Sequence, residues 1–473
     1  MKNMKKIFAL LLAFALVFGL MACTDTGKSE DPKPVESQSE DDSKGGEKEI
    51  IQVDYYCSIG AYLAKLQELV DEYNAGQGKE DGVYINIISN INSYTTDLRA
   101  LMQAGTHYDL IDAGTTNADY FQQGWLQDLS TIDDPELKAL IDSYAAYTRE
   151  GFNKQYGILF SLPLEVVPIK MAVNTDLFEK NNLELPKTWD DVVEAARVIT
   201  ENGNGEEFGF GWSTWTATWR RFLMKGCTMS TGRIHWDPNT ETYDFAPFKE
   251  QIEAVKKMYD NDWMIGADDL KIDPIRAKFA DGVVGMFPAP AYDYAVYTTQ
   301  FPAQCNWTVI DMPLTSAEDA GDYMGTYMER VGASIDAVNY AAASDAKKAA
   351  MVKALCFING DYVNSEVYKI GGMIPYKREI MEETELSADL GPQFALFADL
   401  TNYSFVAPFP DSLITLEGDN FATVFAGYLT GDVKDLDAAI ADLNTRYNDA
   451  YKKLKEAGDV DLSMYAFEYS LKK

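Results

Sequence analysis

Three tryptophans lie close together in the segment GWSTWTATWRRF. If this segment is helical, Trp212, Trp215 and Trp219 share one face, because positions i, i+3 and i+7 lie together on a helix. Flat aromatic rings can stack on the apolar C–H face of a sugar ring, while carboxylates and amides hydrogen-bond its polar rim. A tryptophan face packed into the core would show the same spacing, so the pattern alone leaves both interpretations open.

Tyrosines and acids supply the other candidate ligand contacts. Tyr55 and Tyr56 end the strand-like stretch IIQVDYY. Only one of them is expected to face a ligand, because side chains alternate along a strand. Acids near strand ends could accept hydrogen bonds from a ligand, or they could be ordinary solvated surface acids. These candidates are Asp97, Asp112, Glu165, Glu329 and Asp419.

Patterns typical of catalysis are weak in this chain. The acidic pairs Asp190-Asp191 and Asp268-Asp269 suggest acid–base work at first sight. Adjacent residues of a helix face apart, however, and the carboxylates of a glycosidase must flank one bond at about 5–10 Å. No GxSxG nucleophile motif and no phosphate-binding GxxxxGK[ST] loop is present. We therefore expect no catalytic residue.

Metal and cofactor sites are also not expected. The chain has two histidines, which excludes zinc sites built on several histidines. Asp237, Asn239 and Glu241 have a spacing similar to that of calcium loops, but the glycine and late glutamate of an EF-hand are missing. We predict neither a resident metal nor a cofactor.

The charge balance excludes another class of partner. Lys plus Arg is 41 and Asp plus Glu is 74 in 473 residues, which gives a formal net charge of −33. Such a chain is repelled by nucleic acid and by anionic lipid headgroups. Aromatic residues make up 12% of the chain, so flat surfaces for a ligand are abundant. We expect a monomer that does not bind nucleic acid.

The N-terminus has the pattern of an exported, lipid-anchored protein. Lysines precede an apolar run over residues 7–21, which is too short to span a bilayer comfortably and fits a signal peptide over residues 1–22. Leu20-Met21-Ala22-Cys23 resembles a bacterial lipobox, although an ordinary signal peptide with an accidental cysteine would look similar. Residues 23–49 are polar and predict a disordered tether. We expect an extracytoplasmic protein anchored to the cell membrane by lipidated Cys23.

Four further cysteines lie in the body of the chain. They could form two disulfides, with three possible connectivities, or they could be buried free thiols. Wide spacing and the lack of a CxxC motif favour free thiols. These residues are Cys57, Cys227, Cys305 and Cys356.

The elements that must position the candidate residues alternate between strands and helices. Strand-like stretches at 50–56, 83–89 and 108–114 are separated by helix-like stretches at 60–76 and 95–105. This rhythm predicts a mostly parallel sheet covered by helices, in which ligands bind beyond the carboxyl ends of the strands. A second α/β region begins near Ile169. It includes an amphipathic helix from 189 with Thr188 as its N-cap.

Several motifs follow one another in the order typical of one family. YGILFSLPLEVVPIKMAVNTDLFEKNNLELPKTWDD is the strongest, with Val173 where tyrosine is usual. FADGVVGMFPAPAYD follows, with Gly285 and Tyr292 where alanine and tryptophan are usual. GGMIPYKREI and YLTGDVKDLDAAIADLNTRYN complete the series. Together with the lipobox, these motifs resemble a bacterial extracellular solute-binding lipoprotein of an ABC importer, family 1, carbohydrate type.

The resemblance implies an α/β, two-lobed, periplasmic-binding-protein-like fold of type II. A ligand cleft then lies between lobes that are joined by hinge strands. We predict lobe 1 over residues 50–162 plus 287–343, and lobe 2 over residues 163–286 plus 344–473. The expected crossings are near Ser161–Pro168, Met286–Pro290 and Ala341–Asp345.

The resemblance also implies a function without catalysis. The protein would capture an extracellular solute, expected to be a neutral sugar or oligosaccharide, by lobe closure and deliver it to ABC permease subunits. It places Trp212, Trp215 and Tyr292 among the cleft aromatics. The alternative is a lipid-anchored extracellular glycoside hydrolase, which would also be acidic, aromatic and exported.

Overall fold

The computed structural model describes residues 49–58, 60, 62–89, 94–112, 114, 118–213, 222–266, 271–316, 318 and 321–473. Asp97 falls in a turn of helix whose side chains are not described. The predicted signal peptide, Cys23, nearly all of the tether and Trp215 lie outside the described residues.

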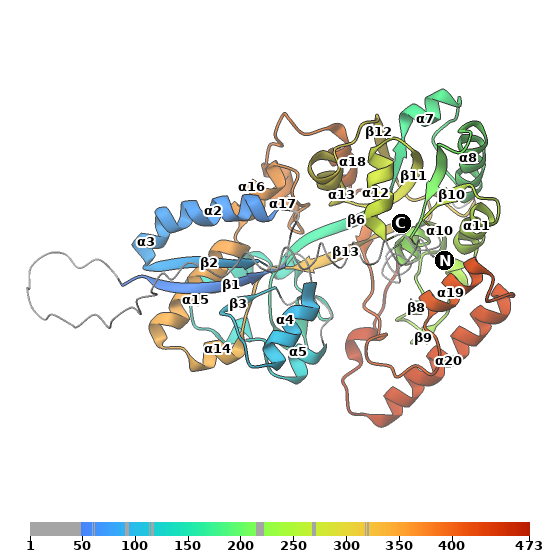
Figure 1. Ribbon diagram of the computed structural model, residues 1–473. Coiled ribbons are helices and arrows are strands. Elements are labelled where there is room, and N and C mark those ends of the chain that lie inside the picture. The colour runs from blue at the N-terminus through green and yellow to red at the C-terminus, as the bar shows by residue number, and fades with distance from the viewer. Residues whose placement is uncertain are drawn as a thin grey trace, which may run out of the picture. The chain divides into compact units, whose positions relative to one another are not determined.

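The first sheet has four strands in the order β14-β3-β1-β2. β1 (Ile51–Cys57) is parallel to β2 (Val83–Ser89) and β3 (Leu110–Ile111), and β14 (Ser334–Ile335) is antiparallel to β3. The parallel arrangement predicted for this part of the chain is confirmed. α2 (Leu63–Ala75) and α15 (Asp345–Asn359) pack against this sheet (Figure 1).

Alternation along β1 divides its side chains between two hydrophobic clusters. Val53, Tyr55 and Cys57 belong to the cluster formed with α2 and α15, while Tyr56 belongs to the cluster on the other side with Leu98. The sheet is therefore covered on both faces, as expected for parallel strands.

The second sheet has seven strands and contains the longest strand of the fold. Its order is β10-β7-β11-β6-β13-β15, and β12 also pairs with β6. All twelve residues of β6 are buried, which fits a central strand with both faces covered. The bounds are β6 Pro163–Asn174, β7 Phe208–Gly211, β10 Met264–Ile265, β11 Val284–Pro290, β12 Trp307–Ile310, β13 Gly325–Val331 and β15 Tyr403–Phe405. Two hairpins, β4 (Lys154–Gln155) with β5 (Ile158–Leu159) and β8 (Trp236–Asp237) with β9 (Thr242–Tyr243), lie apart from both sheets.

Local sequence explains where the helices begin. α8 starts after Thr188, whose side chain accepts a hydrogen bond from the Asp191 backbone, and Asp191 bonds back to the Thr188 backbone. The predicted N-cap is thus confirmed. The remaining helices are α3 Gln77–Asp81, α4 Tyr94–Gln103, α5 Ala118–Gln122, α6 Pro135–Ser143, α7 Thr175–Lys180, α8 Trp189–Asn202, α10 Thr228–Thr231, α11 Lys249–Asp260, α12 Ile272–Ala280, α13 Asp293–Ala295, α14 Ala337–Ala342, α16 Asp361–Lys369, α17 Arg378–Glu383, α18 Pro392–Ala398, α19 Phe421–Thr430 and α20 Leu436–Ala457.

The chain passes between the two sheets three times. It enters β6 at Pro163, returns through Gly332 between β13 and β14, and leaves the first sheet again through a segment at 374–376 that pairs with the start of β6. Gly332 is required at its crossing, because a Cβ there would lie 2.3 Å from Asn359 Oδ1. The Asn359 side chain bonds both the N–H and the carbonyl of Ala333, which fixes this passage.

This packing differs from the lobe division predicted from the sequence. The crossing near Ser161–Pro168 coincides with the start of β6, but Met286–Pro290 is β11, which pairs with β6 and β7 inside the second sheet. Residues 341–345 join α14 to α15, and α15 packs on β1 and β14 of the first sheet. Pro288 and Pro290 lie in this buried strand, whose pairing with β6 fixes its place in the second sheet.

The described residues contain four cysteines, all of them free thiols, as the sequence favoured. Within the described ranges, no helix is both long enough and apolar enough to cross a membrane. The same ranges hold no group of three or more His, Cys, Asp or Glu side chains placed to bind a metal ion.

Candidate ligand-binding site

Polar side chains follow the parallel strands of the first sheet, where such sheets bind ligands. Ser58 follows β1 and Asp112 follows β3. The Ser58 hydroxyl donates a hydrogen bond of 2.5 Å to Asp112 Oδ2, and Asp112 is 5% exposed. The Arg330 guanidinium lies 3.8 Å from the same carboxylate oxygen. The ends of two strands are thereby tied to a residue of β13.

Arg330 also pairs with Glu165 across the two crossing strands. β6 and β13 are antiparallel with Arg330 directly opposite Glu165, and Nη1 lies 2.9 Å from Oε1. Burial raises the pKa of the Glu165 carboxyl above its usual value, with the charge of Arg330 opposing that shift. Burial lowers the pKa of Arg330, but the charges of Glu165 and Asp112 outweigh it and raise the pKa overall. We call Ser58, Asp112, Glu165 and Arg330 the crossing network.

The next residue of β13, Glu329, faces the other way. It accepts a 2.8 Å hydrogen bond from the Tyr376 hydroxyl and forms an ion pair with Arg149. The Arg149 guanidinium also lies over the Phe405 ring, 4.1 Å from its centroid. Glu329 is thus held by residues from two separate segments of the chain, and one of these, Arg149, also contacts Phe405.

Glu329 and Arg149 border a cavity of about 500 Å³. The cavity lies among segments that are distant in sequence, including the residues around the β4–β5 hairpin and the stretch that follows β15. Its lining is formed by Arg149, Gly151, Phe152, Gln155, Met224, Lys225, Met328, Glu329, Val406, Ala407, Pro408, Phe409, Asp411, Ser412, Met464 and Tyr465. We call this space the β13 cavity.

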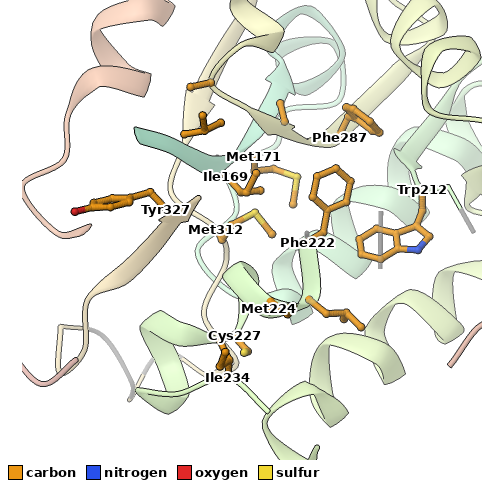
Figure 2. Close-up of a cluster of buried hydrophobic side chains, with 14 of the residues drawn as sticks. Ile169, Met171, Trp212, Phe222, Met224, Cys227, Ile234, Phe287, Met312 and Tyr327 are labelled. Carbon is orange, nitrogen blue, oxygen red and sulfur yellow. The ribbon is translucent and has the colours of Figure 1, made fainter. Parts of the chain in front are cut away.

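Trp212, which follows β7, is a core residue. Its side chain is fully buried, with its ring 6.0 Å from that of Phe210 and 5.6 Å from that of Phe222. Figure 2 shows it among Phe222, Phe287 and Met224 in the interior of the second sheet's core. Of the two interpretations that the tryptophan spacing left open, the core interpretation fits Trp212, because the ring has no exposed face to offer.

Tyr292 follows β11 and stands beside a buried ion pair. Its ring lies 5.8 Å from the Arg276 guanidinium carbon. Arg276 bonds both carboxylate oxygens of Asp293, at 3.1 and 2.5 Å, and Asp293 is fully buried. The half-buried Tyr292 is therefore held at a strand end by a rigid charge pair that sequence analysis did not single out. In the sequence, Arg276 is one of three charged residues of α12, and no local pattern indicates its pairing with Asp293.

The structure separates the remaining candidates. Tyr55 and Tyr56 are both 2% exposed and pack into different clusters, so the expectation that one of them faces a ligand does not match their burial. Asp419 is exposed at the start of α19, where Asn420 is the N-cap. The structure brings together Asp112 and Glu165 through Arg330, and it places Glu329 in the β13 cavity instead.

Comparison with known protein families shows to which family the chain belongs. A family model for bacterial extracellular solute-binding proteins matches residues 59–352, which is more than half of the chain. The chain belongs to this family. The family resemblance predicted from the sequence motifs is confirmed, and membership places this solute-binding protein outside the cytoplasmic membrane.

Several solved structures have a similar fold. The GacH receptor of Streptomyces glaucescens, described unliganded and with acarbose, is 17% identical at a TM-score of 0.65, covering 87% of this chain and 99% of that one. The maltose-bound MalE3 of T. maritima is 16% identical at 0.63, covering 86% and 99%. RafE in complex with raffinose is 17% identical at 0.61, covering 85% and 99%. No curated protein gave a significant match.

These similarities confirm the predicted fold class. The solute-binding protein has the two-lobed α/β fold of periplasmic binding proteins, with mixed sheets surrounded by helices. Its three passages between the sheets, one of them through the buried strand β6, are the connections about which such a fold can bend.

Proposed function

We propose that this solute-binding protein captures a neutral sugar or oligosaccharide and delivers it to the permease subunits of an ABC importer. The main support is the way that charge is balanced at the strand ends. Arg330 is paired with Glu165 and approaches Asp112, and Arg276 is paired with Asp293. Arginines committed in this way do not select an anionic solute, whereas a neutral sugar needs no counter-charge.

The chemistry of the strand ends suits a polyhydroxyl ligand. Tyr292 offers an aromatic ring for stacking, the Asp112 carboxylate can accept hydrogen bonds from ligand hydroxyls, and the Ser58 hydroxyl can accept them as well. Neighbours of the same fold are described with raffinose, maltose and acarbose. These observations support carbohydrate as the ligand class.

Non-enzymatic binding is part of the proposal. Glu165 and Asp112 both lie beside Arg330, and Ser58 also bonds Asp112. A general acid must present a proton to the leaving group, whereas both of these carboxylates are already engaged by Arg330, and Asp112 by Ser58 as well. A hydrolase would need an acid that is free of such a partner.

The test is calorimetry of the purified protein with raffinose, maltose and longer neutral oligosaccharides. Saturable binding of at least one of these sugars is expected, and chromatography of the bound sugar after long incubation should recover it intact. Aspartate and a tripeptide serve as charged controls. Binding of only the controls would refute the sugar assignment, and release of shorter sugars would favour the hydrolase.

Lipid anchoring through Cys23 completes the proposal. A single acyl chain binds membranes only marginally, so durable anchoring needs the diacylated cysteine that a lipobox directs. Cys23→Ala should shift the protein from the detergent phase to the aqueous phase in a Triton X-114 partition. Equal partitioning of the two forms would refute the anchor.

A further inference from the structure

Lys225 is a buried lysine that lines the β13 cavity. Lys225 is 6% exposed to solvent. Among the described residues, no carboxylate lies within ion-pair distance of its ammonium group, and Lys225 makes no other side-chain bond there. A charged group in such a place is unusual, because lysines are almost never fully buried unless they are paired.

Keeping this lysine costs stability. Burial lowers the pKa of Lys225 to about 8, and the charge of Glu329 opposes that shift. The ammonium form therefore still predominates at neutral pH, and within the described ranges no acid forms an ion pair with it to offset its lost hydration. Buried charges that are maintained at such a cost are concentrated at functional sites.

The acids of the β13 cavity are already committed to other partners. Glu329 is bonded to Arg149 and Tyr376. Asp411 lies 3.1 Å from His235 Nε2 and accepts a 2.9 Å hydrogen bond from the Tyr243 hydroxyl. Neither of these two acids contacts Lys225 directly, so an anion that enters the cavity could form an ion pair with its ammonium group.

The rest of the lining is mostly apolar and aromatic. Phe152, Met224, Met328, Phe409 and Tyr465 contribute large side chains. A volume of about 500 Å³ falls within the range of small-molecule pockets, which combine apolar walls with a few polar groups. The two acids nearby would repel a doubly charged ligand such as a phosphate ester more strongly than a single carboxylate.

We propose that the β13 cavity binds a small organic monoanion, a carboxylate on an aromatic or aliphatic body, with Lys225 as its counter-ion. This site is separate from the strand ends proposed to bind sugar. None of the four residues of the crossing network lines the cavity, and Glu329, which does, is bonded to Arg149 and Tyr376 instead.

The test uses 3-phenylpropionate as the probe and the full-length protein in detergent. Calorimetry should detect saturable binding of the acid, while its neutral analogue 3-phenylpropanol and inorganic phosphate bind at least about tenfold more weakly. Lys225→Met should weaken binding of the acid by about tenfold or more and leave binding of the alcohol unchanged. Lys452→Met, at an exposed lysine of α20, is the matched control and should bind like the wild type.

Three outcomes would overturn the proposal: no saturable binding of the acid up to about 10 mM, equal affinity for the acid and the alcohol, or equal affinity of Lys225→Met and the wild type. Thermal unfolding provides an independent readout that also reports folding. The acid should raise the unfolding temperature of the wild type and of Lys452→Met but not that of Lys225→Met. Because the variant removes a destabilising charge, it should itself unfold at no lower temperature than the wild type.

Discussion

Glu329 and Arg330 are consecutive residues of β13 that bind opposite charges on opposite faces of the strand. Arg330 pairs with Glu165 of β6 at 2.9 Å, and Glu329 pairs with Arg149 and accepts a hydrogen bond from Tyr376. The Arg330 side of β13 is thereby joined to β6, which is the first passage between the sheets. The Glu329 side is joined to Tyr376, which lies in the third passage. The register of the crossing strands is fixed by charge as well as by backbone hydrogen bonds.

Loss of Arg330 should destabilise the protein strongly. Arg330→Met leaves Glu165 buried without its ion-pair partner, and removal of one partner of a buried pair costs about 3–5 kcal/mol. Urea unfolding followed by circular dichroism measures the loss. The double variant Arg330→Met with Glu165→Met should recover most of it, because the closer acid is then removed and Asp112 keeps its hydrogen bond from Ser58.

An exposed ion pair provides the control for this prediction. Lys180 and Glu207 lie 2.8 Å apart, with the lysine side chain 54% exposed. Lys180→Met should change the free energy of unfolding by less than about 1 kcal/mol. A similarly small effect of Arg330→Met would show that water replaces the arginine, and the crossing network would then be unimportant for stability.

Lys225 should make stability depend on pH in a predictable window. Its pKa is lowered from 10.5 to about 8 in the folded protein. Below pH 8 both states hold the proton, and the full cost of the buried charge is present. Between about pH 8 and pH 10.5, Lys225 is more protonated in the unfolded chain than in the folded protein, so stability rises with pH. Lys225→Met should therefore be more stable than the wild type near pH 7, by up to about 3 kcal/mol, and the difference should disappear near pH 10.5.

Denaturant unfolding of both forms at several pH values measures this difference. Comparison of the two forms cancels the titration of other groups, which is the same in each. A difference that stays constant from neutral to alkaline pH would contradict the lowered pKa, and it would indicate that Lys225 reaches water in solution.

Part of this architecture could be predicted from the sequence, and particular residues show why the rest could not. The β-α-β rhythm follows from local hydrophobic periodicity, and the Thr188 cap from hydrogen bonds to a residue three positions away. The position of β11 in the sheet is not determined by local sequence, because its partner strands β6 and β7 come from distant segments. The same holds for Arg330 and Arg276, whose partners lie 165 and 17 positions away. Burial of Trp212 also depends on neighbours that spacing along one helix cannot reveal.

Tyr292 and Trp212 should respond to substitution in different ways. Tyr292 is half-buried at a strand end, and loss of a stacked ring should weaken binding of a confirmed sugar by about ten- to hundredfold, or roughly 1–3 kcal/mol by analogy with other ring-stacking contacts. Trp212→Ala should instead cost about 3–5 kcal/mol of folding stability, because its ring is enclosed in the core. Calorimetry and urea unfolding of both variants separate the two roles. Wild-type sugar affinity in Tyr292→Ala would remove Tyr292 from the site.

Closure of the lobes on a ligand should reduce the radius of gyration. A two-lobed protein with three connections can bend about them as rigid bodies, and a ligand shifts the equilibrium toward the closed form only through contacts that it makes better in that form. Small-angle X-ray scattering of the protein with and without a saturating sugar measures the change.

Arg149→Met removes an ion pair to Glu329 and a contact over the Phe405 ring, which together join β13 to two other segments. This variant should alter the radius of the ligand-free form, whereas Lys180→Met should not. An unchanged radius in the wild type at saturation would refute ligand-driven closure, and identical ligand-free radii in Arg149→Met and the wild type would show that Arg149 does not set the open angle.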